Sequence, residues 1–599
     1  MKALLAGLKL SAPPRSCDLA GPESLSRESL IHRAARTLGR RTHVLSVPLG
    51  VGLAAAWVME RLSSNPPVAR AMLGVLDHDD LVDTPAGGVG AGLDPDPAGR
   101  NHTPLHRQCR NPIMRRSGWK TVVPAALLAL VGSAAAASAA TGAHRADGLP
   151  GPVARAIRSL SLPESGISLW VQPVDGAEPL LSVNADVPRN PASTLKLVTT
   201  FAALDGLGPA YTWHTDVFLE TAPEAGRVAG DVWLRGSGDP YLVAEEYWKL
   251  ADALRKRGLR RIDGDLVFDN SYFQLEAEDR GAFDNRPDRV YNMPPHPLLV
   301  NFNAVRFEVR PEPDGRSVAV QADPPLPNLA LDNRLRLYPA PCGGYQRGVA
   351  VAMADPAERD RVMLEGRFPN GCDAYALTRT VLQPESYAFG LFDLYWHQLG
   401  GELGGRWRTG AVPDAQAEPF YRHHSRPLGD VIRLVNKYSN NVMTRHLALT
   451  LGAERFGAPA TTDKGRRALY ERLAAHDIDT AGLEVSNSAG LSRDSRITAR
   501  QLAGVLQAAW RSPFMPEFVS SLSISGMDGT MRRRLVGTPA AGRMHLKTGR
   551  LDHVSAVAGY VTTRSGRRLL LVALINAPEA HRGLGEDLQD VLLRWAVDQ

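Results

Sequence analysis

The stretch Pro191-Ala-Ser-Thr-Leu-Lys-Leu-Val198 places a serine three residues before a lysine at the start of a predicted helix. Pro191 opens this helix and Gly206 closes it, as proline and glycine typically do. Residues three apart lie on one helix face, so Lys196 can reach the Ser193 hydroxyl. If burial lowers its pKa, a lysine can take the serine's proton and create a nucleophile. Taken alone, the pair favours the other interpretation, a capping serine and a solvated lysine.

Two further short motifs follow, Ser439-Asn440-Asn441 and Lys547-Thr548-Gly549. The first interrupts an amphipathic helical pattern with poor helix formers, which predicts either a turn kept for its side chains or an ordinary loop between helices. In the functional interpretation, Ser439 relays a proton to the leaving group and Asn441 clamps the substrate. The second motif opens a predicted strand whose lysine and threonine can hold a carboxylate, while glycine permits close approach. The chain has only nine lysines, so chance explains the lysine-containing motifs poorly.

The hydrophobic pattern divides the chain into three parts. Residues 166–184 alternate as a β-hairpin, and the helix of the first motif follows. Residues 209–427 form short strands broken by Gly, Pro, Asp and Asn, with helices only at 245–257 and 385–399. Helices return from Leu428, and the chain ends in an edge strand, a hairpin and a helix. We therefore expect one α/β domain built from residues 148–208 and 428–599, interrupted by a β-rich insertion over 209–427.

An export signal is predicted inside the chain. Residues 114–120 are basic, residues 121–131 are apolar, and Ala137-Ser138-Ala139 resembles a signal cleavage site. We expect 114–139 to be a signal peptide that starts at Met114, and 1–113 to be an extension from an upstream start codon. The alternative is a genuine domain over 1–113 followed by a membrane anchor at 121–140.

Charge and cysteine content agree with export. Residues 1–139 hold sixteen basic and ten acidic residues, so the remainder carries 53 of each and gives no reason to expect nucleic acid binding. Cys342 and Cys372 then remain, and two cysteines in an exported chain predict a disulfide, with two free thiols as the alternative. No clustered His and Cys pattern indicates a metal site, and we expect no cofactor.

Beyond the three motifs, the segments LRGSGDPYL, VYNMPPHPLLVNFNAV, NKYSNNVMTRHL and GMDGTMRRR carry a family resemblance. From about residue 150 to the end, the chain resembles the low-molecular-mass class C penicillin-binding proteins. These are D-alanyl-D-alanine carboxypeptidases and endopeptidases of the bacterial periplasm or cell exterior. The 246 residues from Ser193 to Ser439 exceed what a β-lactamase allows, and this family carries an insertion at that place.

The resemblance implies a transpeptidase-like catalytic domain, with an antiparallel sheet flanked by helices and two smaller β-rich domains inserted, one nested in the other. It implies that Ser193 is acylated and that Lys196 is its base. The oxyanion hole would use the backbone N–H groups of Ser193 and Arg550. The remaining site residues implied are Ser439 and Asn441 as the second motif, and Lys547, Thr548 and Gly549 at the substrate carboxylate.

Two places depart from the family pattern, and a third matches it only loosely. Arg550 stands where a small hydroxyl residue is often found, which affects how the carboxylate is held. Asn487-Ser488-Ala489-Gly490 replaces a more usual Asp/Asn-Gly-Ser-Gly. Asp288 aligns loosely with an acidic residue that meets the amine of a diamino acid in the substrate.

The expected partners are peptidoglycan peptides, with β-lactams as inhibitors and a homodimer left open. Ser193 would attack the carbonyl between two D-alanines, or a D-amino acid cross-link, and water would hydrolyse the acyl-enzyme. Two other functions are weighed: a non-catalytic wall-binding protein, against which Ser193, Lys196 and Lys547 argue, and a β-lactamase, against which the insertion argues.

Overall fold

The computed structural model describes residues 148–343, 348–353, 360–414 and 418–599. The extension over 1–113 and the signal peptide over 114–139 lie outside the described residues, so both stay predictions. In the part of the chain that is described, no helix is both long and apolar enough to span a bilayer.

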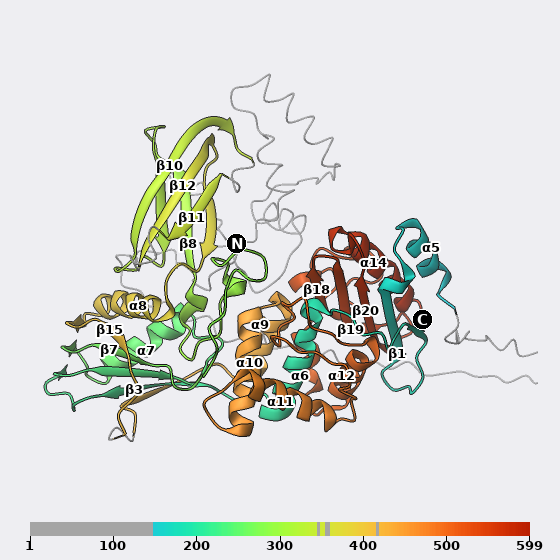
Figure 1. Cartoon of the computed structure of the whole chain (residues 1–599), viewed down its shortest axis with the longest axis horizontal. Helices are drawn as coiled ribbons and strands as arrows, with labels where there is room; N and C mark the ends of the chain where they lie inside the picture. Colours follow the sequence, from blue (N-terminus) through green and yellow to red (C-terminus); the bar gives the residue numbers. More distant parts are fainter. Residues whose placement is uncertain (1–147, 344–347, 354–359, 415–417) are drawn as a thin grey trace, which may run out of the picture. The chain divides into compact units, whose positions relative to one another are not determined.

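A six-stranded antiparallel sheet combines strands from before and after the β-rich segment (Figure 1). Its order is β17-β18-β19-β20-β1-β2. The predicted hairpin is confirmed, since Leu169 of β1 pairs with Val183 of β2. On its other side β1 pairs with β20, which unites the segments before and after the insertion. The strands are Ile167–Pro173 (β1), Leu181–Val183 (β2), Ser523–Ile524 (β17), Met544–Leu551 (β18), Val554–Thr562 (β19) and Arg568–Asn576 (β20).

Both faces of this sheet are covered by helices, because β20 is apolar on both sides. Leu570, Val572 and Leu574 pack into one core, while the residues between them pack into another, as the two-residue period of a strand requires. The first core contains α6 (Lys196–Leu207), α9 (Leu428–Tyr438), α10 (Asn441–Phe456), α11 (Thr462–Ala474), α12 (Ala499–Arg511) and α13 (Met515–Ser521). The second contains α5 (Gly151–Ser159) and α14 (Leu584–Val597).

The described residues of the predicted β-rich segment form four further sheets between residues 214 and 424. A five-stranded sheet has the order β15-β7-β5-β3-β16, so the chain leaves it after β7 and returns for β15 and β16. Two three-stranded sheets, β13-β8-β9 and β10-β12-β11, form in between, and β14-β6-β4 makes the fourth. Their strands are β3 (His214–Leu219), β4 (Arg227–Val228), β5 (Val232–Gly236), β6 (Arg261–Ile262), β7 (Leu266–Asp269), β8 (Val305–Pro311), β9 (Val318–Asp323), β10 (Ala330–Pro341), β11 (Val349–Met353), β12 (Arg361–Gly371), β13 (Tyr375–Arg379), β14 (Glu402–Leu403), β15 (Trp407–Thr409) and β16 (Tyr421–His424).

Two helices accompany these sheets where the sequence predicts them. They are α7 (Ala244–Lys256) and α8 (Pro384–Gln398). The turn-like residues of Ser439-Asn440-Asn441 also behave as predicted, since they separate α9 from α10.

Two local predictions need correction. The helix at Pro191 begins with a 3-10 turn, η2 (Ala192–Leu195), and α6 proper starts only at Lys196. In a 3-10 turn, residues three apart eclipse one another, so this tighter winding serves the Ser-x-x-Lys spacing better than an α-helix would. Lys547 lies in the middle of β18 and does not open it, because the pairing with β19 already begins at Met544.

A disulfide joins Cys342 to Cys372, as expected. Strands β10 and β12 run parallel and end side by side, with Pro341 paired to Gly371. Because parallel strands finish at the same edge, the residue after each strand meets its counterpart. The bond therefore ties together the ends of two strands in one small sheet.

We predict that peptide mapping without reduction will recover a Cys342–Cys372 linked peptide. Replacing both cysteines by serine should lower the stability of this sheet by about 3 kcal/mol, because the unfolded loop is no longer closed. Hydrogen exchange should quicken in β10 and β12, while β18 to β20 serve as an internal control and keep their protection. Two alkylatable thiols at these positions in the native protein would contradict the assignment.

Candidate active site

The amino group of Lys196 lies at the centre of the candidate site. Its Nζ atom is 3.0 Å from the Ser193 hydroxyl, 2.7 Å from Oδ1 of Asn441 and 2.6 Å from the carbonyl oxygen of Ala489. These groups come from the 3-10 turn, from α10 and from the loop before α12. Lys196 thus joins the first and second sequence motifs through a single atom.

Burial changes the chemistry of this lysine. Its side chain has no exposed surface, and desolvation lowers its pKa well below the usual value, with a smaller contribution from the positive charge of Lys547. All three contacts are ones that a neutral or a charged amine can make with oxygen atoms. A buried lysine with a lowered pKa beside a serine hydroxyl has the arrangement of a general base and its nucleophile.

The Ser439 side chain is presented by a break between two helices. Ser439 ends α9 in a left-handed conformation, with φ at +59°, so the chain turns sharply before α10. Asn440 then caps α10, because its side chain accepts a hydrogen bond from the backbone N–H of Met443. Asn441 follows in the first turn and donates from Nδ2 to the carbonyl of Tyr291 at 3.3 Å. Asn440 therefore makes the turn, and Asn441 faces Lys196.

Strand β18 brings the third motif to the same place. Nζ of Lys547 donates to the Ser439 hydroxyl at 2.8 Å and to the Thr548 carbonyl at 2.7 Å. Lys547 is fully buried, and this burial lowers its pKa to about 7. Two amines, Lys196 and Lys547, therefore flank two hydroxyls, Ser193 and Ser439, in one continuous polar site.

Two glycines let the backbone close around the serine. A Cβ atom on Gly549 would lie 2.8 Å from the backbone nitrogen of Ser193. The backbone of β18 therefore packs directly against the 3-10 turn. Gly490 has φ at +76°, and a Cβ there would overlap the carbonyl of Ala192. Ala192 itself has φ at +45°, an uncommon value for alanine, which places backbone strain immediately before Ser193. The turn is therefore enclosed by backbone on two sides.

Asn190 was not singled out from the sequence, yet it anchors this turn. Its side chain accepts from the N–H of Ala192 and donates to the carbonyl of Ser492. Its backbone exchanges two hydrogen bonds with the side chain of Asn576 at the end of β20. The only available signal was its place just before Pro191, where a short polar residue commonly starts a turn.

Two predicted site residues have other partners. The carboxylate of Asp288 forms an ion pair with Arg379 of β13, so it is already neutralised by a cation of the chain itself. The Arg550 side chain is exposed and lies 3.5 Å from Glu586 of α14, while its backbone remains in β18 after Gly549. Their roles at the substrate stay predictions.

Metal ligands do not gather in the described ranges: no three His, Cys, Asp or Glu side chains there are placed to hold an ion. The polar groups described above are amines, hydroxyls and amides, which suit acyl transfer to a serine.

Comparison with known proteins identifies the family. The model of the D-Ala-D-Ala carboxypeptidase 3 (S13) family matches residues 151–597. The D-alanyl-D-alanine carboxypeptidase of Actinomadura sp. strain R39 is 28% identical over 475 residues, which cover 77% of this chain and 87% of that protein. The carboxypeptidase DacB of Haemophilus influenzae is 24% identical over 420 residues, covering 69% and 86%.

A solved structure shows the same fold. The crystal structure of penicillin binding protein 4 from Haemophilus influenzae superposes with a TM-score of 0.64 at 22% identity, covering 75% of this chain and 99% of that one. The predicted resemblance and the predicted fold class are thereby confirmed. The chain belongs to the D-Ala-D-Ala carboxypeptidase 3 (S13) family and is a D-alanyl-D-alanine carboxypeptidase.

Proposed function

We propose that Ser193 is the nucleophile of this carboxypeptidase and that Lys196 is its general base. The observation that carries the proposal is the 3.0 Å contact between the buried Lys196 amine and the Ser193 hydroxyl. Burial lowers the pKa of this lysine, so a useful fraction is neutral and can accept the serine's proton.

Acylation begins when the Ser193 oxygen attacks the carbonyl between two D-alanines. The proton passes to Lys196, and the negative charge of the tetrahedral intermediate develops on the former carbonyl oxygen. The backbone N–H groups of Ser193 and Arg550 are proposed to stabilise this oxyanion. The approach of Gly549 to the Ser193 nitrogen supports this, because it sets β18 and the 3-10 turn side by side.

The terminal D-alanine leaves as an amine and needs a proton. Ser439 is proposed to deliver it, since its hydroxyl lies 2.8 Å from the Lys547 amine, which can resupply the proton. The proton that Lys196 took from Ser193 replaces the one given up by this relay, which leaves Lys196 neutral again. Water then attacks the acyl-enzyme, and Lys196 takes a proton from it and passes that proton to the departing Ser193 oxygen, which releases the shortened peptide.

Substrate binding is proposed to use the charge of Lys547 and the hydroxyl of Thr548 for the terminal carboxylate. Asn441 is proposed to donate to the substrate backbone in place of the Tyr291 carbonyl that it now contacts. The same nucleophile would open D-amino acid cross-links between peptidoglycan stems, which present an equivalent amide. The homodimer that the sequence left open finds no support in the comparisons.

β-Lactams are proposed to acylate Ser193, because they present an activated amide beside a carboxylate. The penicillin binding protein 4 of Haemophilus influenzae has been solved in complex with a β-lactam. A non-catalytic wall-binding protein would have no use for an amine buried against its serine, and a β-lactamase is disfavoured by the insertion.

Export is proposed from the sequence alone, with 114–139 as the signal peptide and the bacterial periplasm or cell exterior as the destination. The described sheets over 214–424 are proposed to form two inserted domains, one nested in the other. This agrees with the return of β15 and β16 to the sheet of β3, β5 and β7.

We predict that a fluorescent penicillin will label the protein and that a Ser193→Ala variant will take no label. Among the described oxygen atoms in contact with Lys196, the Ser193 hydroxyl alone can be acylated, and the variant lacks it. Intact mass before and after treatment measures the label and also locates the N-terminus of the exported protein. Ser159→Ala, at the exposed end of α5, is the matched control and should label as fully as the wild type. Equal labelling of the Ser193→Ala variant would remove Ser193 as nucleophile.

We predict a bell-shaped pH profile for kcat/KM with a pentapeptide ending in D-Ala-D-Ala. The rate should rise as Lys196 loses its proton, and fall near pH 7 as Lys547 loses the charge that attracts the carboxylate. In a Lys547→Arg variant the falling limb should move to higher pH, because arginine keeps its charge. Lys249→Arg, on the exposed side of α7, should leave the profile unchanged. A falling limb that stays near pH 7 in Lys547→Arg would assign it to another group.

A further inference from the structure

A second threonine hydroxyl lies beside Thr548 at the mouth of the site. Oγ1 of Thr530 is 2.8 Å from Oγ1 of Thr548, although the two residues come from different segments. Thr530 belongs to a short 3-10 turn, η6 (Gly529–Met531), between β17 and β18, and its side chain is exposed. Nothing in the proposed reaction uses this hydroxyl.

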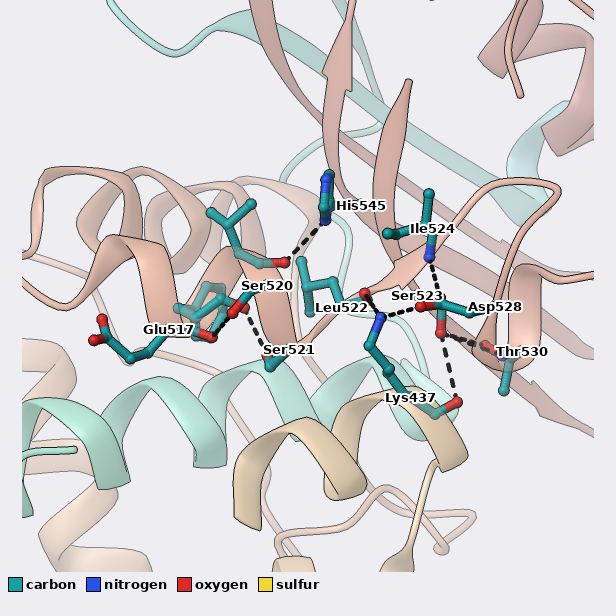
Figure 2. A network of polar contacts seen from close by, with 12 residues as sticks. Lys437, Glu517, Ser520, Ser521, Leu522, Ser523, Ile524, Asp528, Thr530 and His545 are labelled. Atoms are coloured by element: carbon teal, nitrogen blue, oxygen red, sulfur yellow. Dashed lines mark hydrogen bonds and ion pairs between the residues drawn. The ribbon is translucent and has the colours of Figure 1, made fainter. Parts of the chain in front are cut away.

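Thr530 is held in place from behind by a buried polar network, shown in Figure 2. Its backbone N–H donates to the hydroxyl of Ser523 at 3.2 Å, and the two hydroxyls lie 3.3 Å apart. Ser523 is completely buried, and its hydroxyl also reaches the carbonyl of Lys437 at 3.5 Å. The exposed Thr530 is therefore held in position by its hydrogen bonds to the buried Ser523.

An ion pair fixes the same turn to the helix that carries Ser439. Nζ of Lys437 lies 2.5 Å from Asp528 Oδ2 and 2.9 Å from the carbonyl of Leu522 (Figure 2). The other oxygen of Asp528 accepts the N–H of Ile524 at 2.7 Å. The Lys437 side chain is 6% exposed and the Asp528 side chain is 34% exposed, so water screens this pair only in part.

The turn packs closely against its neighbours at Gly529. Gly529 has φ at +53°, and a Cβ atom there would overlap the Ser523 hydroxyl and lie 2.8 Å from the Lys437 carbonyl. Lys437 is two residues before Ser439, so one element sets the position of both Ser439 and Thr530. An exposed hydroxyl that is fixed this firmly is preorganised to bind a ligand.

We propose that Thr530 is a substrate-binding residue whose hydroxyl, paired with that of Thr548, holds the terminal carboxylate of the peptide. The proposal rests on the proposed function, because it assigns this carboxylate to the Lys547–Thr548 end of the site. A carboxylate has about four acceptor positions. Lys547 and Thr548 fill only some of them, and the Arg550 side chain points to Glu586. A second hydroxyl 2.8 Å from the first suits the other carboxylate oxygen.

The hydroxyl contacts of both threonines can be exchanged for contacts to a ligand. Thr548 donates to Thr530, and the hydroxyls of Thr530 and Ser523 share a contact. Hydroxyl hydrogens rotate to suit their partners, so both threonines can turn toward an incoming carboxylate without any change in the backbone. The supporting bond from the Thr530 N–H to Ser523 remains in place.

The test measures the second-order rate of acylation by benzylpenicillin and by its methyl ester, which lacks the carboxylate charge. Thr530→Val keeps the shape of the side chain and removes its hydroxyl. We expect its rate with benzylpenicillin to fall by on the order of 10-fold to 100-fold, as for a lost hydrogen bond to a charged group, and its rate with the ester to change less than about twofold. The kcat/KM for a D-Ala-D-Ala pentapeptide should fall with the first rate.

Two further variants complete the test. Thr530→Ser keeps the hydroxyl and should restore most of the benzylpenicillin rate. Thr378→Val, an exposed threonine of β13, is the matched control and should behave as the wild type with both compounds. Wild-type protein that takes no penicillin at Ser193 would overturn the proposed function itself.

With a labelled wild type, three results overturn the role of Thr530 alone. They are an unchanged rate in Thr530→Val, an equal loss with acid and ester, or a Thr530→Ser variant as slow as Thr530→Val. An equal loss would mean that Thr530 only supports the local structure. Thermal unfolding of each variant confirms that the compared proteins are folded.

Discussion

The site depends on one amine that is kept out of water among three oxygen atoms. Lys196 contacts Ser193, which is 3 residues away in sequence, and Asn441 and the Ala489 carbonyl, which are 245 and 293 residues away. Removing a charge from water is costly, so burial favours the neutral amine that a general base requires. The 3-10 turn, α10 and the loop at Ala489 together enclose this amine.

Enclosure is achieved largely by backbone. Strand β18 approaches the 3-10 turn where Gly549 offers no side chain, and the loop at Gly490 closes the other side. Asn190 ties the turn to the end of β20. The strained φ of Ala192 is tolerated because these neighbours leave the turn no alternative position.

A second buried lysine organises the substrate side in a different way. Lys547 has a pKa lowered to about 7 and contacts Ser439 directly, whereas Lys437 forms an ion pair with Asp528 behind it. Lys547 can exchange a proton near neutral pH, whereas Lys437 fixes the turn that carries Thr530. Lys547, which contacts a hydroxyl, is thus suited to proton transfer. Lys437, which is paired with the carboxylate of Asp528, is suited to positioning.

The sequence by itself determined the family, the three motifs in their order, the two-part catalytic segment with its β-rich interruption, and the disulfide. These follow from residue type, short spacing and local hydrophobic period, all of which act within a few turns or strands. Tertiary structure alone decided that Lys196 meets Asn441 and the Ala489 carbonyl, that Asp288 pairs with Arg379, and that Asn190 and Thr530 border the site. A backbone carbonyl has no signature in sequence, and an ion pair or a hydroxyl pair depends on which distant segments the sheet brings together.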